Sequence, residues 1–245
     1  MIEIKTLKKV DMTGCTFIEG FPGAGLVGPM SISYMVNKLG MDYIGYIVGT
    51  AFPPLVSIHG DVPLPPCRLY YSKKYRIVAL FAEANVVSET AIYEMSEKLR
   101  DFIKAGKMSQ IISLSGVPVE NPNNQDVFAL ASKKGTVDRL KGFGMKSIGE
   151  GVAAGIGALM LMYASMDGMD DVNILVPVNP QMIDPRYAEL AIKSINKLLK
   201  LNIDTDELEK EASVVEERIK SILKKSKETK DGVNGSKEAG PSMYA

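Results

Sequence analysis

The stretch TFIEGFPGAGLVG, residues 16–28, decides the fold, because it leads from a short apolar strand into a glycine-rich turn. Residues Thr16 to Glu19 have the composition of a buried strand. Pro29, which a helix accepts in its first turn, follows the glycines and opens a helix that we expect to end near Leu39. A strand, a tight turn and a helix in this order predict an α/β domain.

Strands and helices continue to alternate beyond this segment. We expect strands at Tyr43–Gly49, Leu55–His59, Cys67–Tyr71, Arg76–Ala82, Gln110–Leu114 and Asn173–Val178, and helices at Ser88–Ala105, Gly155–Met166 and Pro185–Leu201. Short apolar strands between helices predict a mostly parallel sheet covered on both faces, and the paired strands of the first third predict an antiparallel portion. The sequence thus predicts one α/β core domain over residues 1–203, with a mixed, mostly parallel sheet flanked by helices.

A C-terminal amphipathic helix is expected over residues 204–225. Asp204 and Glu207 form a capping box at its start, acidic residues crowd its first turns and lysines its last. Its apolar residues form a narrow seam with spacings of four and three: Leu208, Ala212, Val215, Ile219 and Ile222. Such a seam packs either on the parent domain or on a partner subunit, and the sequence leaves both possibilities open.

The segment 226–245 has the composition of a flexible tail. Between Ser226 and Ser242 the only apolar residue larger than alanine is Val233, so this stretch cannot bury enough surface to order itself. Its end differs, because Met243, Tyr244 and Ala245 follow. Tyrosine is frequent at binding hot spots, methionine adds an adaptable apolar contact, and a terminal carboxylate can pair with a lysine or with backbone donors. These three residues are therefore the candidate partner-binding site.

The bulk composition narrows the class of function. The 245 residues include 29 Lys or Arg and 29 Asp or Glu, so the chain has no overall electrostatic attraction to nucleic acid or to an anionic membrane. No apolar run approaches the roughly 20 residues that span a bilayer, and the first residues lack the apolar stretch of a signal peptide. Cys15 and Cys67 are too few for a disulfide framework. We expect a cytoplasmic protein.

The glycines Gly23, Gly25 and Gly28 match the G-x-G-x-x-G pattern of dinucleotide-binding turns. That function also needs an acidic residue about 20 positions further on to hold a ribose, but residues 43–60 contain neither Asp nor Glu. Prolines on both sides remove backbone donors from the turn. A tight turn with close helix–sheet packing is favoured, and a small-anion loop at these three glycines is the alternative. The glycines Gly149, Gly151, Gly155 and Gly157 offer the same two interpretations before the helix that follows them.

His59 and Glu83 are weaker candidates for chemistry. His59 is the only histidine, no G-x-S-x-G nucleophile elbow occurs, and one imidazole without paired thiolates does not make a metal site. Glu83 follows an apolar strand, where α/β enzymes place catalytic groups, but the sequence places no second carboxylate opposite it. We therefore expect no catalytic residue, no metal and no cofactor, and we expect His59 in a loop near a subunit contact.

The turn FPGAGLVG at residues 21–28, the α/β order and the terminal Met243, Tyr244 and Ala245 together resemble the archaeal proteasome assembly chaperone family, most closely its homologue B group. The resemblance covers residues 1 to 200 loosely and is most specific at the turn and at the triplet. It implies a fold similar to nucleoside phosphorylases, homo-oligomers and no need for ATP.

By the same resemblance, the partners are the α-subunits of the proteasome core particle. Met243 is then the hydrophobic position, Tyr244 the tyrosine and Ala245 the free end of a hydrophobic-Tyr-X motif that enters pockets between α-subunits, where the carboxylate meets a lysine. The function implied is a chaperone or activator and not an enzyme. Two other functions stay open at this point: a small-molecule enzyme, such as a nucleoside phosphorylase or an ATP-dependent ligase, built around Gly23 to Gly28, and a purely structural oligomer.

Overall fold

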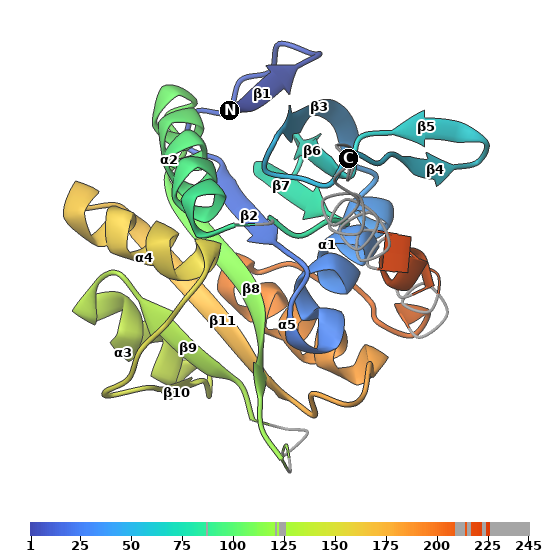
Figure 1. The fold of residues 1–245 in the computed structure, drawn as a ribbon. Helices are drawn as coiled ribbons and strands as arrows, with labels where there is room; N and C mark the ends of the chain where they lie inside the picture. The colour runs from blue at the N-terminus through green and yellow to red at the C-terminus, as the bar shows by residue number, and fades with distance from the viewer. Residues whose placement is uncertain are drawn as a thin grey trace, which may run out of the picture.

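The computed structural model describes residues 1–86, 88–120, 122, 126–208, 214, 217–221 and 224–225. Within this part of the chain, nine strands form one sheet in the order β1-β3-β6-β7-β2-β8-β11-β9-β10 (Figure 1). Their bounds are Ile2–Thr6 (β1), Thr16–Gly20 (β2), Asp42–Gly49 (β3), Cys67–Ser72 (β6), Ile77–Ala82 (β7), Gln110–Pro118 (β8), Phe128–Ala131 (β9), Lys146–Ser147 (β10) and Asp170–Val178 (β11). Strands β4 (Ser57–His59) and β5 (Val62–Leu64) form a separate hairpin.

The strands β7, β2, β8 and β11 run parallel in the middle of the sheet. The strands β1, β3, β6 and β7 pair antiparallel on one side, and β9 pairs antiparallel with β11 on the other. The predicted mixed α/β sheet flanked by helices is therefore confirmed.

Two helical layers cover the sheet (Figure 1). Helices α1 (Val27–Lys38) and α5 (Pro185–Leu199) lie on one face, and α2 (Glu89–Ala105) and α4 (Ile156–Asp167) lie on the other. Because successive strand residues point to opposite faces, Ile18 and Ile112 enter the core under α1 and α5, whereas Phe17 and Ile111 enter the core under α2 and α4. None of the helices in the described ranges is long and apolar enough to cross a bilayer.

Some elements differ from the prediction. The strand expected at Leu55–His59 is shorter, because prolines around it cannot donate to a ladder, and its remainder belongs to the β4–β5 hairpin. The edge strand β1 was not predicted, and neither were β9, helix α3 (Lys134–Gly142) and β10. Strands β1 and β10 are the two edge strands of the sheet, and neither has an apolar run: β1 alternates isoleucine with polar residues, and β10 is Lys-Ser. Strand β9 has an apolar run of only four residues.

The described residues of the expected helix 204–225, which we call the C-terminal segment, pack on the preceding α/β domain, which we call the body. Leu208 and Ile219 are buried in the core on the α1 and α5 face, so for these two seam residues the parent domain is the contact. The seam residues Ala212, Val215 and Ile222 lie outside the described residues. Glu207 forms an ion pair with Lys38 of α1, which holds the start of the segment against that helix.

The glycine turn sets the distance between α1 and the sheet. Gly25 has a φ of +65°, and Leu26 also has a left-handed conformation, so the chain reverses sharply before α1 begins. A Cβ atom on Gly28 would lie 2.7 Å from the Cα of Gly20 and 2.9 Å from the carbonyl oxygen of Leu114. The first turn of α1 therefore approaches β2 and β8 more closely than any side chain permits.

Substitution of Gly28 by alanine tests this close approach. Gly28→Ala should lower the free energy of unfolding by about 1–3 kcal/mol, because the added methyl group overpacks the contact. Gly135→Ala is the matched control, because Gly135 is likewise the second residue of its helix and a Cβ there meets nothing within 4 Å. It should leave stability unchanged or raise it by up to about 1 kcal/mol. Urea unfolding measures both, and equal stabilities would contradict the packing role of Gly28.

Candidate functional site

The candidate partner-binding residues Met243, Tyr244 and Ala245 lie outside the described residues, as does the whole expected tail 226–245. Gly23, Gly25 and Gly28 lie in the turn before α1, where Gly25 approaches Val178 and Gly28 approaches β2. A small-anion loop at these glycines stays a prediction. The structure shows where the C-terminal segment contacts the body.

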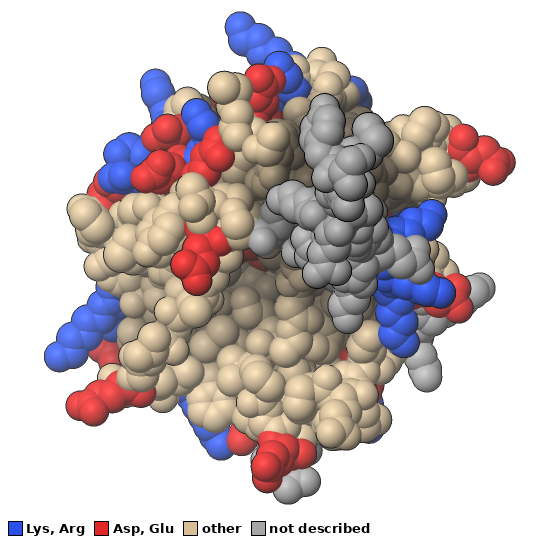
Figure 2. Space-filling model, in the orientation of Figure 1, with Lys and Arg blue, Asp and Glu red and all other residues tan. Residues whose placement is uncertain are grey.

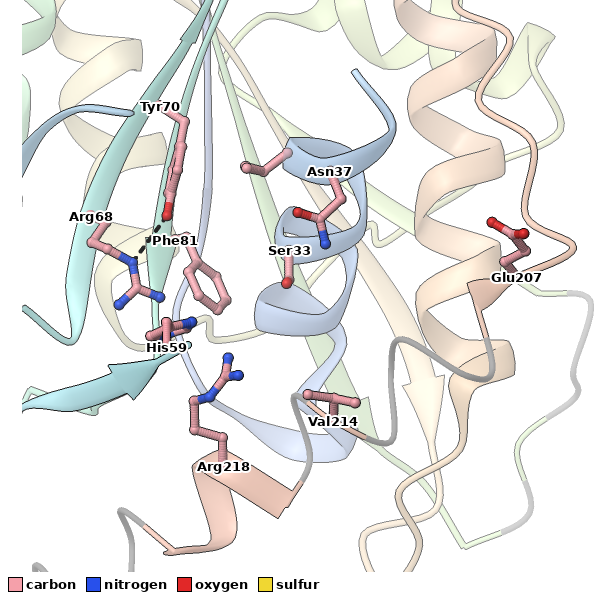
Figure 3. A pocket seen from close by; sticks show the side chains of 10 residues that line it. Ser33, Asn37, His59, Arg68, Tyr70, Phe81, Glu207, Val214 and Arg218 are labelled. Carbon is pink, nitrogen blue, oxygen red and sulfur yellow. Dashed lines mark hydrogen bonds between the residues drawn. The ribbon is translucent and has the colours of Figure 1, made fainter. Parts of the chain in front are cut away.

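A charged cavity of about 390 Å³ lies at this attachment. It is lined by Ser33 and Asn37 from α1, His59 from β4, Arg68 and Tyr70 from β6, and Glu207 and Arg218 from the C-terminal segment. Figure 3 shows the side chains of Arg68, His59 and Arg218 converging from three different segments at one end of this cavity.

These three side chains meet at the carboxylate of Glu83, the residue that follows β7. Arg68 donates through Nη2 to Oε2 at 2.8 Å, and His59 Nε2 lies 3.1 Å from the same oxygen. Arg218 donates through Nη1 to Oε1 at 3.0 Å. Since Glu83 is fully buried, its charge needs these partners, and together they join β4, β6 and the C-terminal segment at one point.

Arg68 is held on all sides. Its Nε donates to the Tyr70 hydroxyl at 3.1 Å, as Figure 3 shows, and its Nη1 donates to the Pro65 carbonyl at 2.8 Å. The guanidinium carbon lies 4.9 Å from the centre of the Phe81 ring. A fully buried arginine with these partners has a fixed orientation, so it presents Nη2 to Glu83 in one geometry.

Burial and the neighbouring guanidinium groups determine the protonation states of Glu83 and His59. Burial raises the pKa of Glu83, but the Arg68 charge and the other neighbours outweigh it, so the pKa lies below its usual value. Burial and the Arg68 charge lower the pKa of His59. At neutral pH the cluster therefore holds an ionised Glu83, two guanidinium groups and a neutral imidazole. Because both guanidinium groups bind the carboxylate, Glu83 acts as an anchor and not as a free base.

Sequence reasoning identified His59 and Glu83 separately but missed the two arginines. The signal for Arg68 is its place as the one charged residue of the apolar strand β6, CRLYYS. Arg218 carries no comparable signal, because it belongs to a helix pattern rich in charges, and it lies 135 positions after its partner Glu83.

A second polar cluster lies beneath α4. Glu19, Ser113 and Asn173 are register neighbours on the adjacent parallel strands β2, β8 and β11. All three are buried on the face covered by α2 and α4. Asp171 lies two residues before Asn173 on β11 and therefore points to the same face. We call these four residues the polar row. In the described part of the chain, no three His, Cys, Asp or Glu side chains are grouped so as to hold a metal ion.

Both carboxyl groups of the polar row titrate abnormally. Burial raises the pKa of Glu19 to about 7. Burial, with the neighbouring Glu19 charge as a second cause, raises the pKa of Asp171 well above its ordinary value. A Cβ on Gly157, in the first turn of α4, would lie 3.0 Å from Asn173 Nδ2. Gly157 thus lets α4 approach the polar row closely, whereas a Cβ on Gly149 or Gly155 would meet nothing within 4 Å, so the packing interpretation holds at Gly157.

Comparison with known proteins gives a consistent result. The model of the PAC2 family matches residues 17–223. An uncharacterised protein of Methanocaldococcus jannaschii is 27% identical over 214 residues, which cover 87% of each chain. The crystal structure of Pyrococcus furiosus PbaA, described as an archaeal homologue of proteasome-assembly chaperone, is 26% identical, has a TM-score of 0.82 and covers 94% of this chain and 100% of its own.

The crystal structure of PbaB from the same organism, described as an archaeal proteasome activator, has a TM-score of 0.76 and covers 91% of this chain and 98% of its own. At 21% identity it shows a shared fold. The resemblance to archaeal homologues of proteasome assembly chaperones that the sequence predicts is confirmed.

Replacement of Arg218 by methionine tests the anchor at Glu83. Arg218→Met keeps an apolar side chain but removes the 3.0 Å bond to a buried carboxylate, so the C-terminal segment should lose about 1–3 kcal/mol of local stability. Amide hydrogen exchange at Ile219 should become faster while exchange in the central strands stays the same. Arg139→Met is the control, because the pair of Arg139 with Asp170 is half exposed and contributes at most about 1 kcal/mol. Unchanged exchange at Ile219 would refute the anchor.

The raised pKa of Glu19 predicts a pH dependence of stability. A group whose pKa rises from 4.5 to about 7 on folding stabilises the protein below the unfolded value and loses that contribution as the pH rises through the folded one. Stability should therefore fall from about pH 5 to about pH 8, by on the order of 3 kcal/mol for this group. In Glu19→Gln this fall should be smaller, with a remainder from Asp171. Urea unfolding at both pH values measures it, and an equal fall in the variant would contradict the assignment.

Proposed function

This chain belongs to the PAC2 family, and from that premise we propose that it is an ATP-independent, proteasome-associated chaperone that acts by binding and not by catalysis. The likeness to PbaA, at 26% identity over 94% of this chain, supports a role like that of a proteasome assembly chaperone. We further propose that the partner surface is the α-ring of the core particle, and that Met243, Tyr244 and Ala245 make the contact.

The single observation that carries this proposal is the combination of an anchored C-terminal segment with the terminal triplet. In this proposal the triplet contributes an apolar side chain, an aromatic ring with a hydroxyl group and a free carboxylate at Ala245. A cleft lined by apolar groups and a lysine would bind all three. The composition of residues 226–242 predicts a flexible tether with a root-mean-square span of roughly 20–25 Å, long enough for the tip to reach a cleft beside the docked body.

The anchor makes the tether effective, because it fixes where the tether starts. Arg218 bound to Glu83, Ile219 in the core and Glu207 bound to Lys38 hold the C-terminal segment at one place on the body. Because the C-terminal segment is fixed to the body, only the expected tail 226–245 determines how far the terminal residues can reach. A shorter flexible length raises the effective concentration of the tip at a nearby cleft.

Self-association would strengthen this contact. The β4–β5 hairpin projects from the body, as Figure 1 shows, and it exposes Ile58 and Val62 by more than half, with Val56 beside them. Exposed apolar side chains on a projecting hairpin are typical of protein contacts and support the proposed homo-oligomer. Several tails on one oligomer would gain avidity on the order of 10²–10⁴ over a single tail on a ring of α-subunits.

Substitution of Tyr244 by alanine tests the docking proposal. Tyr244→Ala should reduce binding to the isolated α-ring by at least about tenfold, because hot-spot aromatic residues contribute 2 kcal/mol or more. Adding one glycine after Ala245 should weaken binding similarly, because it moves the carboxylate out of register. Surface plasmon resonance with immobilised α-ring measures the affinity. Tyr93→Ala is the control, since Tyr93 is exposed on α2 of the body, and it should bind normally. Normal binding by both tail variants would exclude the triplet as the contact.

A further inference from the structure

Helix α4 is apolar around nearly its whole circumference. Residues 151–166 contain no charged side chain, and the only charged residue of α4 is Asp167 at its end. The buried residues of the helix are Ile156, Met160 and Ala164, which form one stripe along it. A helix that is apolar on all sides is normally buried on all sides. Within the described part of the chain, α4 is covered on one side only, so its composition calls for a further contact.

The outer face of α4 lies opposite the buried stripe and consists of Ala158, Leu159, Met162, Ser165 and Met166. Met162 is 44% exposed and Met166 is 72% exposed. Figure 2 shows a largely uncharged surface where α4 lies in Figure 1, with charged side chains gathered beside it over α2. An uncharged centre that contains methionine, next to a charged rim, is typical of a protein–protein contact.

We propose that the outer face of α4 packs against the same face of a second copy of this chain, with the two helices antiparallel about a two-fold axis at Met162. This contact rests on the homo-oligomer proposed above and names one of its interfaces. In a two-fold contact both copies use the same patch, so residues equally far before and after the axis meet. Ala158 therefore faces the partner's Met166, and Leu159 faces the partner's Ser165.

Each of these facing pairs joins a large and a small side chain. Met166 lies over Ala158 and Leu159 lies over Ser165, which is the alternation of large and small residues that close helix packing requires. In a parallel arrangement Met166 would face the partner's Met166 and Ala158 the partner's Ala158, with crowding at one end and a gap at the other. The outer face is thus complementary to itself in the antiparallel orientation.

The charges at the two ends of α4 also complement each other in this arrangement. At the carboxyl end, Arg100 and Lys104 of α2 both contact Asp167. Basic groups are in excess there, because Lys98, Arg100, Lys104 and Lys107 outnumber Glu97, Asp101 and Asp167. At the amino end, the one charged residue of the loop 148–155 is the exposed Glu150. The antiparallel crossing brings the acidic loop of each copy to the basic end of the other, and it aligns the helix dipoles favourably.

Disulfide crosslinking of the full chain tests the position of the axis. Met162→Cys places two thiols opposite each other on the axis, so mild oxidation should convert most of the chain to a linked dimer on a non-reducing gel. The native Cys15 and Cys67 are buried and do not compete. Tyr93→Cys is the control, because Tyr93 is 55% exposed on α2 outside the proposed contact, and it should stay unlinked. Equal linking of the two variants overturns the proposal.

A mixture of two variants tests the orientation of the helices. Ala158→Cys and Met166→Cys should each stay unlinked alone, because each thiol lies two helical turns from its counterpart in an antiparallel pair. The mixture should give a linked dimer of one chain of each kind. Linking of each variant with itself, without linking in the mixture, would show parallel helices and contradict the proposed geometry.

A charge on the axis tests the contact without a covalent bond. Met162→Lys places two like charges face to face, so sedimentation equilibrium should show self-association weakened by at least about tenfold. Leu7→Lys is the control, because Leu7 is 58% exposed after the edge strand β1, and it should associate like the native chain. Native association of Met162→Lys, together with no linking of Met162→Cys, assigns α4 to a different protein and overturns this contact alone. A single-chain mass for the native protein at all concentrations overturns the proposed homo-oligomer as well. The tail variants decide the contact with the α-ring separately.

Discussion

The buried ion pair of Arg68 and Glu83 is the interaction on which the arrangement of the C-terminal segment depends. Both side chains are buried, with Arg68 on β6 and Glu83 directly after the neighbouring antiparallel strand β7. Arg68 binds one oxygen of Glu83, so the other oxygen requires a further partner. A buried charge without full pairing is strongly destabilising, so the fold must bring further groups to this carboxylate. His59 comes from the β4–β5 hairpin and Arg218 from the end of the described chain. One carboxylate thereby fixes two peripheral segments to the sheet.

The cluster around Glu83 and the polar row differ in how many of their polar atoms have hydrogen-bond partners. At Glu83 both carboxylate oxygens have partners among charged or ring nitrogens of the chain, which suits an anchor. In the polar row, Asn173 lines an open cavity, and within the described part of the chain its Oδ1 is buried without a hydrogen-bond partner. Burial disfavours the charged form of a carboxyl group, and it raises the pKa of Glu19 to about 7. The body thus combines a rigid attachment for the tail on one face with an incompletely paired cluster on the other.

Short-range sequence patterns predicted the helices and strands whose formation depends mainly on neighbouring residues. Glycines and Pro29 mark the turn before α1, and apolar runs mark the central parallel strands, so this part of the fold follows from short-range patterns. The strand–helix–strand unit of β9, α3 and β10 was missed because α3 and β10 contain few apolar residues and the apolar run of β9 is only four residues long. The contact of Arg218 with Glu83 depends on tertiary folding and has no local signal. The polar row does have one: Glu19, Ser113 and Asn173 each directly follow an apolar residue inside a strand.

The central claim is that the anchored C-terminal segment presents its terminal residues to another protein and not to its own body. Photo-crosslinking tests this most directly, with a benzophenone amino acid at position 244 in the full chain mixed with isolated α-ring. Mass spectrometry of the products identifies which residues lie within reach of the side chain. The account predicts crosslinks to α-subunit residues at the boundary between neighbouring subunits. Crosslinks confined to residues of this same chain, in the presence of excess α-ring, would contradict it.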